Sequence, residues 1–238
     1  MLRNISGTFE SGQIYVIHGV NGAGKSTFLN AVSGVIPEII RAEGKIHVDM
    51  DQSPAYGHIG YVPQGVEKSL FFDTPASMLD HLPQEKTKPW IARFSLDRID
   101  PECRTMGELS SGECKKFELI GEILNDAHEI LLLDEPSAYL DEKSKKTLME
   151  LIESVKKERI ILLVTHDRFF DQMDAQFCWL EKEGLRHWKP EERLQESQER
   201  QKREAYRKTS GWNCRVEIPD QLREHFGYTF SELEFSRG

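Results

Sequence analysis

A glycine-rich loop near the N-terminus constrains the fold of this chain more than any other feature. The loop matches the pattern G-x-x-x-x-G-K-[ST] and reads Gly19-Val20-Asn21-Gly22-Ala23-Gly24-Lys25-Ser26-Thr27. The apolar run 14–18 before it suits a buried parallel strand, and residues 25–33 after it are predicted to form a helix that ends before Gly34. Strand, glycine loop and helix in this order predict a phosphate-binding loop in an α/β fold.

The residue types in the loop fit this interpretation chemically. Glycines let backbone N–H groups turn inward and cradle a β-phosphate, and the helix N-terminus adds partial positive charge. Lys25 supplies a point charge to the β- and γ-phosphates, and Ser26 is expected to ligate Mg²⁺. The alternative, a glycine-rich turn with a chance Lys-Ser, is the weaker one because both flanks of the motif also fit.

A second apolar run, residues 130–135, ends in the two carboxylates Asp134 and Glu135. One acid at the tip of a buried strand suits Mg²⁺, which prefers oxygen ligands, and the second can orient or deprotonate an attacking water. The alternative is a solvated strand end before a turn at Pro136. A phosphate loop upstream favours the catalytic interpretation.

Three further segments are weak signals when each is taken alone, and it is their order along the chain that makes them informative. Residues 59–64 read as an extended segment that ends in Gln64, whose amide could reach Mg²⁺ or the attacking water, and residues 160–166 as an apolar strand that ends in His166. Residues 109–113 open an amphipathic helix, in which Ser110 and Glu113 have capping-box spacing. Its apolar face carries Phe117, Ile120 and Leu124.

In this order the segments resemble the motifs of the ATP-binding cassette (ABC) ATPases, over about residues 2 to 188. The family order is Walker A, glutamine loop, signature, Walker B with the catalytic glutamate, aspartate loop and switch histidine. The matching positions here are 19–27, Gln64, Leu109-Ser110-Ser111-Gly112-Glu113, 130–135, 137–141 and His166. The signature distinguishes this family from other phosphate-loop ATPases.

The resemblance implies a phosphate-loop NTPase core with a mostly parallel sheet, an inserted helical subdomain and a C-terminal extension. It implies hydrolysis of ATP with Mg²⁺. The implied catalytic residues are Glu135, His166, Gln64 and Lys25, and the implied metal ligands are Ser26, Asp134 and Gln64. In the family the signature closes over the nucleotide of the opposite subunit, so the resemblance also implies a dimer with a second ABC subunit.

Two departures from the family pattern affect which properties of the family can be expected of this chain. The signature has Ser111 where glycine is usual and Glu113 where glutamine is common, and we expect function to survive these changes. The aromatic residue that stacks on adenine in the family has no evident counterpart before Lys25. Phe9 and Tyr15 are poor substitutes, because the pattern places them in or beside the strand that leads into the loop.

Composition excludes several classes of protein. The net charge is −9, with 31 basic and 40 acidic residues, which argues against a broad nucleic-acid-binding surface. The four cysteines, Cys103, Cys114, Cys178 and Cys214, lack metal-site spacing and are expected as free thiols in a reducing compartment. We expect no signal peptide, and no apolar run approaches the roughly 20 residues of a membrane helix.

The predicted organisation is an ABC ATPase domain over residues 1–188 and a partly helical extension over 189–238. Within the domain, 1–64 and 119–188 form the core, with a short strand at 44–49, and 65–118 form the helical subdomain. Leu70-Phe71-Phe72 are either core residues or a surface for a partner. Asp141 is expected to cap the helix that carries Leu148, Leu151, Ile152 and Val155.

These observations predict a cytoplasmic ATPase that lies on the inner face of a membrane and powers transport through a separate membrane-spanning subunit. The alternative is a soluble ABC ATPase that acts on ribosomes or nucleic acid, because residues 165–170 look somewhat like the translation-factor branch of the family. A regulatory protein that binds ATP without turnover is disfavoured by Glu135 and His166.

Overall fold

The computed structural model describes residues 5, 7–34, 58–66, 71–181 and 184–187. The chain divides into two compact units between Lys189 and Pro190, and every described residue belongs to the first unit. The predicted strand at 44–49, Leu70 and the predicted extension 189–238 lie outside the described residues. No helix in the described ranges is long and apolar enough to cross a membrane.

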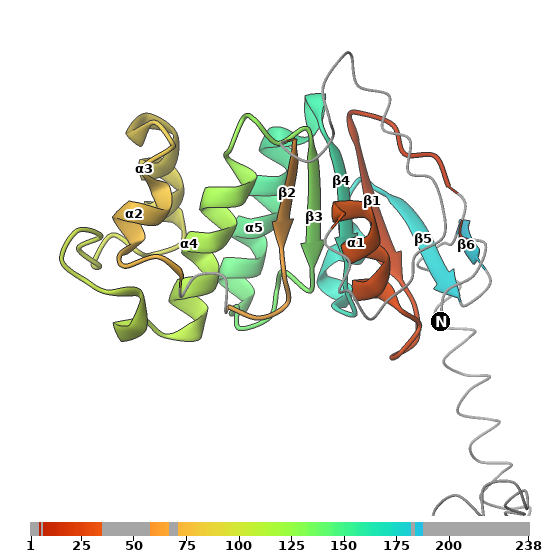
Figure 1. Cartoon of the computed structure of the whole chain (residues 1–238), viewed down its shortest axis with the longest axis horizontal. Coiled ribbons are helices and arrows are strands. Elements are labelled where there is room, and N and C mark those ends of the chain that lie inside the picture. Colours follow the sequence, from red (N-terminus) through yellow and green to blue (C-terminus); the bar gives the residue numbers. More distant parts are fainter. Residues whose placement is uncertain (1–4, 6, 35–57, 67–70, 182–183, 188–238) are drawn as a thin grey trace, which may run out of the picture. The chain divides into compact units, whose positions relative to one another are not determined.

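A mostly parallel sheet forms the centre of the first unit (Figure 1). Within the described part of the chain the strand order is β2-β3-β4-β1-β5-β6. All neighbouring strands run parallel except β5 and β6, which pair antiparallel. The strands are β1 (Gln13–His18), β2 (Ile59–Val62), β3 (Ile130–Asp134), β4 (Ile160–Val164), β5 (Gln176–Glu181) and β6 (Gly184–His187). The strands predicted at 14–18, 130–135 and 160–166 are present, but β3 ends at Asp134 and β4 ends at Val164, so the predicted bounds are too long at the carboxyl ends of these two strands.

Helices cover both faces of this sheet. The α-helices are α1 (Lys25–Ser33), α2 (Pro75–Leu79), α3 (Gln84–Arg93), α4 (Ser111–Ile123) and α5 (Glu142–Val155), and the short 3₁₀ helices are η3 (Met106–Glu108), η4 (Lys156–Glu158) and η5 (Arg168–Gln172). The predicted helix at 25–33 is confirmed and ends at Gly34 in the left-handed conformation. The predicted boundary between helical subdomain and core at residue 118 falls inside α4, which continues without a break to Ile123.

Alternating strand residues build a separate apolar core on each face of the sheet. On the face of α1, Ile17, Leu132 and Val164 pack with Phe28 and Leu29. The opposite face packs its strand residues against α2, α4 and α5, and this larger core contains Val16, Leu131, Leu133, Leu163, Phe117, Ile120, Leu148 and Leu151. Because β1, β3 and β4 are buried on both faces, they carry near-continuous apolar runs.

Helix caps predicted from the sequence are present. The Ser110 hydroxyl accepts a hydrogen bond from the Glu113 amide at 3.3 Å, and the Glu113 carboxylate accepts one from the Ser110 amide at 2.8 Å. Asp141 caps α5 by accepting a hydrogen bond from the Ser144 amide at 2.7 Å. Phe72 packs against the larger core, whereas the Phe71 side chain is 88% exposed.

Candidate active site

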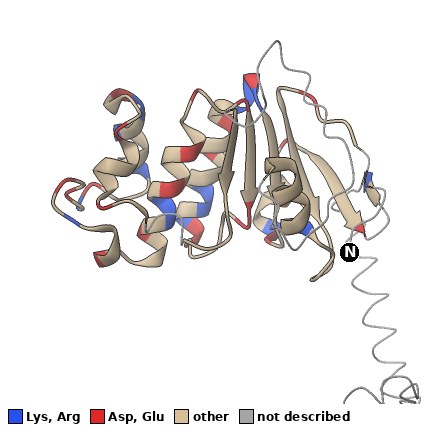
Figure 2. Cartoon of the chain, in the orientation of Figure 1, with Lys and Arg blue, Asp and Glu red and all other residues tan. Residues whose placement is uncertain are grey.

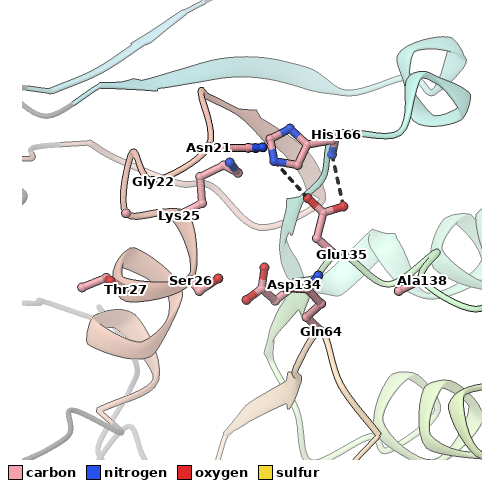
Figure 3. A pocket seen from close by; sticks show the side chains of 11 residues that line it. Asn21, Gly22, Lys25, Ser26, Thr27, Gln64, Asp134, Glu135, Ala138 and His166 are labelled. Carbon is pink, nitrogen blue, oxygen red and sulfur yellow. Dashed lines mark hydrogen bonds and ion pairs between the residues drawn. The ribbon is translucent and has the colours of Figure 1, made fainter. Parts of the chain in front are cut away.

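The catalytic segments predicted from the sequence meet at one edge of the sheet, because β1, β2, β3 and β4 are parallel and each candidate residue follows a strand's carboxyl end. A cavity of about 670 Å³ opens at this edge (Figure 3). Its lining residues are Asn21, Gly22, Gly24, Lys25, Ser26, Thr27, Gln64, Asp134, Glu135, Ala138 and His166. Residues as far apart in the chain as Asn21 and His166, which are separated by 145 positions, therefore line the same cavity.

The glycine loop joins β1 to α1 with backbone angles that require glycine at two positions. Gly22 has φ 77° and Gly24, the residue before α1, has φ 97°. The Phe28 amide donates to the Gly24 carbonyl at 2.8 Å, so the helix begins directly after the loop. The first amides of α1 and their partial positive charge are thereby directed at the cavity, as phosphate binding requires.

Lys25 is buried at the start of α1, and its ammonium donates to the carbonyls of Gly19 at 3.1 Å and Val20 at 3.3 Å. Burial lowers the pKa of Lys25 from its ordinary value, and the negative charges of Glu135 and Asp134 oppose this shift. Lys25 therefore shares the cavity with two acids whose negative charges offset part of the desolvation of its ammonium.

Asp134 is the last residue of β3 and is 3% exposed. Burial raises the pKa of its carboxyl group, while hydrogen bonding by Ser26 and the charges of Lys25, Lys115 and His166 act in the opposite direction. A buried carboxylate whose negative charge the protein does not fully compensate is suited to binding a cation. Together, Asp134, the Ser26 hydroxyl and the Gln64 amide offer oxygen ligands of the type that Mg²⁺ prefers. The described residues contain no group of three or more His, Cys, Asp or Glu side chains that could hold a metal.

Glu135 does not extend β3, although the sequence placed it in the same strand. The strand ends at Asp134, and Glu135 adopts a left-handed backbone with φ 45°. Its amide donates to the Val164 carbonyl at 2.8 Å, which fixes this turn against the end of β4. The extended conformation expected for residue 135 is therefore wrong, and the turn directs its side chain into the cavity (Figure 3).

The Glu135 carboxylate is held by the segment that follows β4. One oxygen accepts hydrogen bonds from the Thr165 hydroxyl and the His166 amide, both at 3.1 Å. The other oxygen lies 3.6 Å from the His166 ring nitrogen Nε2 (Figure 3). Glu135 and His166 thus form one unit at the edge of the cavity, in which the Thr165 hydroxyl and the His166 amide orient one carboxylate oxygen and the other oxygen faces the imidazole.

The signature segment lies elsewhere. Among the described residues, none of Leu109 to Glu113 lines the cavity. Ser111 is exposed at the start of α4, and Gly112 lies against the aspartate loop of the same chain. A Cβ at Gly112 would come within 2.9 Å of the Tyr139 carbonyl oxygen, so only glycine fits this contact without a shift. Tyr139 itself has φ 67° and a side chain that is 59% exposed.

Sequence reasoning missed two buried polar residues beside the site. His18, the last residue of β1, is 1% exposed. Its Nδ1 lies 2.9 Å from the Thr165 carbonyl and its Nε2 lies 3.2 Å from the Asp171 carboxylate, so it links the phosphate loop to the segment before His166. Lys115 on α4 is fully buried. The position of His18 at the end of an apolar strand could have indicated its role, whereas no local sequence pattern indicates that Lys115 is buried.

Of the two aromatic residues considered for base recognition, Tyr15 belongs to the core and Phe9 is half-buried against it. Tyr15 is 6% exposed, and Phe9 packs edge-on against it with ring centroids 4.8 Å apart. The Tyr15 hydroxyl accepts a hydrogen bond from the Glu10 amide at 2.8 Å. A buried ring in this position is not available to stack on a base.

Comparisons with known proteins agree with this geometry. The family model described as ABC transporter matches residues 2–138. The chain is 30% identical over 192 residues to the energy-coupling factor transporter ATP-binding protein EcfA1 of Thermotoga maritima, covering 73% of this chain and 70% of that protein. It is 32% identical over 172 residues to the zinc import ATP-binding protein ZnuC of Cereibacter sphaeroides, covering 70% and 67%. A solved structure of an ATP binding subunit of an ABC transporter has the same fold, with a TM-score of 0.61 at 20% identity, over 80% of this chain and 84% of that one.

A phosphate loop after β1, opposite two acids after β3, defines a phosphate-loop nucleoside triphosphatase with a mostly parallel α/β fold. Within this class the chain belongs to the ABC transporter family. It is an ATP-binding subunit of that family with ATPase activity, as predicted from the order of its motifs.

Proposed function

We propose that this chain hydrolyses ATP with Mg²⁺ at the cavity between α1 and β3, as half of a dimer of ABC subunits that powers transport through a separate membrane-spanning partner. The observation that carries the proposal is the meeting of Lys25, Ser26, Asp134, Glu135 and His166 around one cavity, while the signature lies outside it. A site that lacks its signature within the chain is completed by a signature from a second subunit.

Each residue of the cavity has a distinct role in the proposed reaction. The loop amides and Lys25 bind the β- and γ-phosphates, and Lys25 exchanges its bonds to the Gly19 and Val20 carbonyls for phosphate oxygens. Ser26, Asp134 and Gln64 hold Mg²⁺ directly or through water. When bound, the ion supplies positive charge next to the phosphoryl group that is transferred.

Glu135 acts on the attacking water. Its carboxylate is held in place by Thr165 and the His166 amide, so it can accept the proton of a water without first reorganising. The His166 imidazole lies 3.6 Å from the second carboxylate oxygen, and in the proposed reaction it contacts the γ-phosphate. Positioning and electrostatics supply most of the rate enhancement in such a reaction, and the base adds about 10²–10⁴-fold.

The names of the relatives support a membrane partner and a location at the membrane. EcfA1 and ZnuC are named as ATP-binding proteins of an energy-coupling factor transporter and of zinc import, and the manganese transport system ATP-binding protein MntB of Bacillus subtilis is 29% identical over 197 residues. We therefore assign the chain to the cytoplasm, peripheral to the inner face of a membrane. Acidic and basic residues are interspersed over α4 and α5 in Figure 2, which gives no support to direct nucleic-acid binding.

Two measurements test the proposal. The chain is purified in a form that hydrolyses ATP slowly, and its mass is measured by size-exclusion chromatography with light scattering, with and without Mg-ATP. We expect Mg-ATP to convert monomer to dimer, and a strictly monomeric chain at saturating ATP contradicts the homodimer. Affinity purification from native membranes is expected to recover a membrane-spanning subunit, whereas recovery of ribosomes would favour the translation-factor alternative.

A further inference from the structure

The side chain of Lys115 is fully buried, with 0% exposure, on the second turn of α4. A buried ammonium is costly unless acceptors replace its lost water. Its neighbour one turn on, Glu118, is 2% exposed and places a carboxylate oxygen 3.3 Å from the Lys115 ammonium. Ion pairs at this helical spacing usually lie on the surface, so the burial of this one calls for a partner outside α4.

That partner is the glutamine loop, the segment 63–65 that follows β2. The Lys115 ammonium donates to the carbonyl oxygen of Pro63 and, at 3.4 Å, to that of Gly65. These two residues flank Gln64, whose side chain lines the cavity (Figure 3). One ammonium on the signature helix therefore holds the backbone on both sides of Gln64, some 50 residues away in sequence.

We propose that Lys115 is a positioning residue for Gln64, which it fixes at the cavity by binding the two backbone carbonyls on either side. The inference rests on the proposed role of Gln64 at the metal and water positions.

The position of Lys115 on α4 connects the signature segment to the glutamine loop. The signature segment ends at Glu113 in the first turn of α4, and Lys115 lies two residues further along the same helix. A displacement of α4 when the signature engages a second subunit is transmitted to residues 63–65 through these bonds. Lys115 does not touch the phosphate or the water in this scheme, and it acts through Gln64.

The experiment uses a variant that removes both buried charges, Lys115→Met with Glu118→Met, since the single Lys115→Met change would leave an unpaired carboxylate and could prevent folding. Lys116→Met is the matched control. Lys116 is the next residue on α4 and also donates to a backbone carbonyl, that of Phe94 at 3.2 Å, but in the helical region and not in the glutamine loop. Thermal unfolding establishes that each variant is folded before activity is measured.

The first readout is independent of activity. Hydrogen exchange measured by mass spectrometry on a peptide spanning residues 59–66 reports the order of the glutamine loop. We expect exchange at residues 64–66 to rise at least about tenfold in the double variant and to stay at the wild-type rate in Lys116→Met. Unchanged exchange in the folded double variant overturns the proposal.

The second readout is the rate of ATP hydrolysis as a function of Mg²⁺ concentration. Supporting groups around a metal site typically change affinity or activity by 10–100-fold, so we expect kcat to fall and the half-saturating Mg²⁺ concentration to rise by about this factor, with little change in the KM for ATP. Lys115→Arg, which keeps the charge, is expected to retain part of the activity.

A double-mutant cycle with Gln64→Ala separates this inference from the proposed function. If Lys115 acts through Gln64, the double charge variant has little further effect in the Gln64→Ala background. Additive losses overturn the positioning role while leaving the role of Gln64 intact. If Gln64→Ala alone hydrolyses ATP at the wild-type rate with the wild-type Mg²⁺ dependence, the proposed function of Gln64 fails first, and the positioning role fails with it.

Discussion

Replacing Glu135 by glutamine separates its proposed chemical role from a structural one. The carboxylate oxygen that accepts bonds from Thr165 and the His166 amide can be replaced by the amide oxygen of glutamine, which has the same reach and accepts the same bonds. The left-handed backbone at residue 135 is fixed by the bond to the Val164 carbonyl, which involves no side chain. The substitution therefore leaves the site assembled and removes only the base.

The expected effect on hydrolysis is the contribution of a general base. Loss of such a group typically slows a reaction by about 10²–10⁴-fold, which corresponds to about 2.7–5.5 kcal/mol of transition-state stabilisation. Affinity for ATP is expected to change little, because Lys25 and the loop amides make the ground-state contacts. The ATP-bound dimer is expected to persist longer, since it is consumed by hydrolysis. Single-turnover release of phosphate and equilibrium binding of ATP measure the two effects separately.

Glu142→Gln is the matched control for this experiment. Glu142 is an exposed acid in the first turn of α5, so the change removes the same charge from the segment that follows β3 without touching the cavity. We expect wild-type hydrolysis from the control. Wild-type hydrolysis from Glu135→Gln would refute the reasoning, and activation of water would then fall to Gln64 or His166.

Three further predictions concern binding, stability and base selectivity. Lys25→Ala is expected to weaken ATP binding itself, measured by calorimetry, because it removes a ground-state charge contact, and an unchanged Kd would contradict this. Asp134→Asn is expected to abolish hydrolysis and to raise the unfolding temperature at pH 7. Burial raises the pKa of the Asp134 carboxyl group, so above that pKa the ionised group destabilises the folded protein, and asparagine removes this charge. A lowered unfolding temperature would contradict this. With Tyr15 buried, ATP is expected to be preferred over GTP only weakly in competition assays, and strong discrimination would mean that another residue of the protein reads the base.

Local sequence signals predicted much of the fold. The apolar runs at 130–134 and 160–164 are buried on both faces as parallel strands, and the Ser110–Glu113 pair forms its capping box, because each feature depends on residues close in the chain. The gathering of the motifs at one sheet edge follows from the parallel strand order of the structure, since parallel strands bring their carboxyl ends together.

What the sequence did not reveal depends on contacts between distant segments. The turn at Glu135 is imposed by the end of β4, because glutamate has no local preference for a positive φ. Lys115 has the spacing of an ordinary surface ion pair with Glu118, and its burial follows only when residues 63–65 pack onto α4. His18 is similar, since its two partners, Thr165 and Asp171, are about 150 residues away.

The start of α4 is joined to two loops of the site by contacts of different kinds. Gly112 lies against the Tyr139 carbonyl with no room for a Cβ, so steric contact links it to the aspartate loop after β3. Lys115 binds the carbonyls beside Gln64, so hydrogen bonds link it to the loop after β2. A rigid helix that is held at both points cannot move at its first turn without moving both loops. The signature and the cavity are separate in space, and this pair of contacts makes the position of one depend on the position of the other.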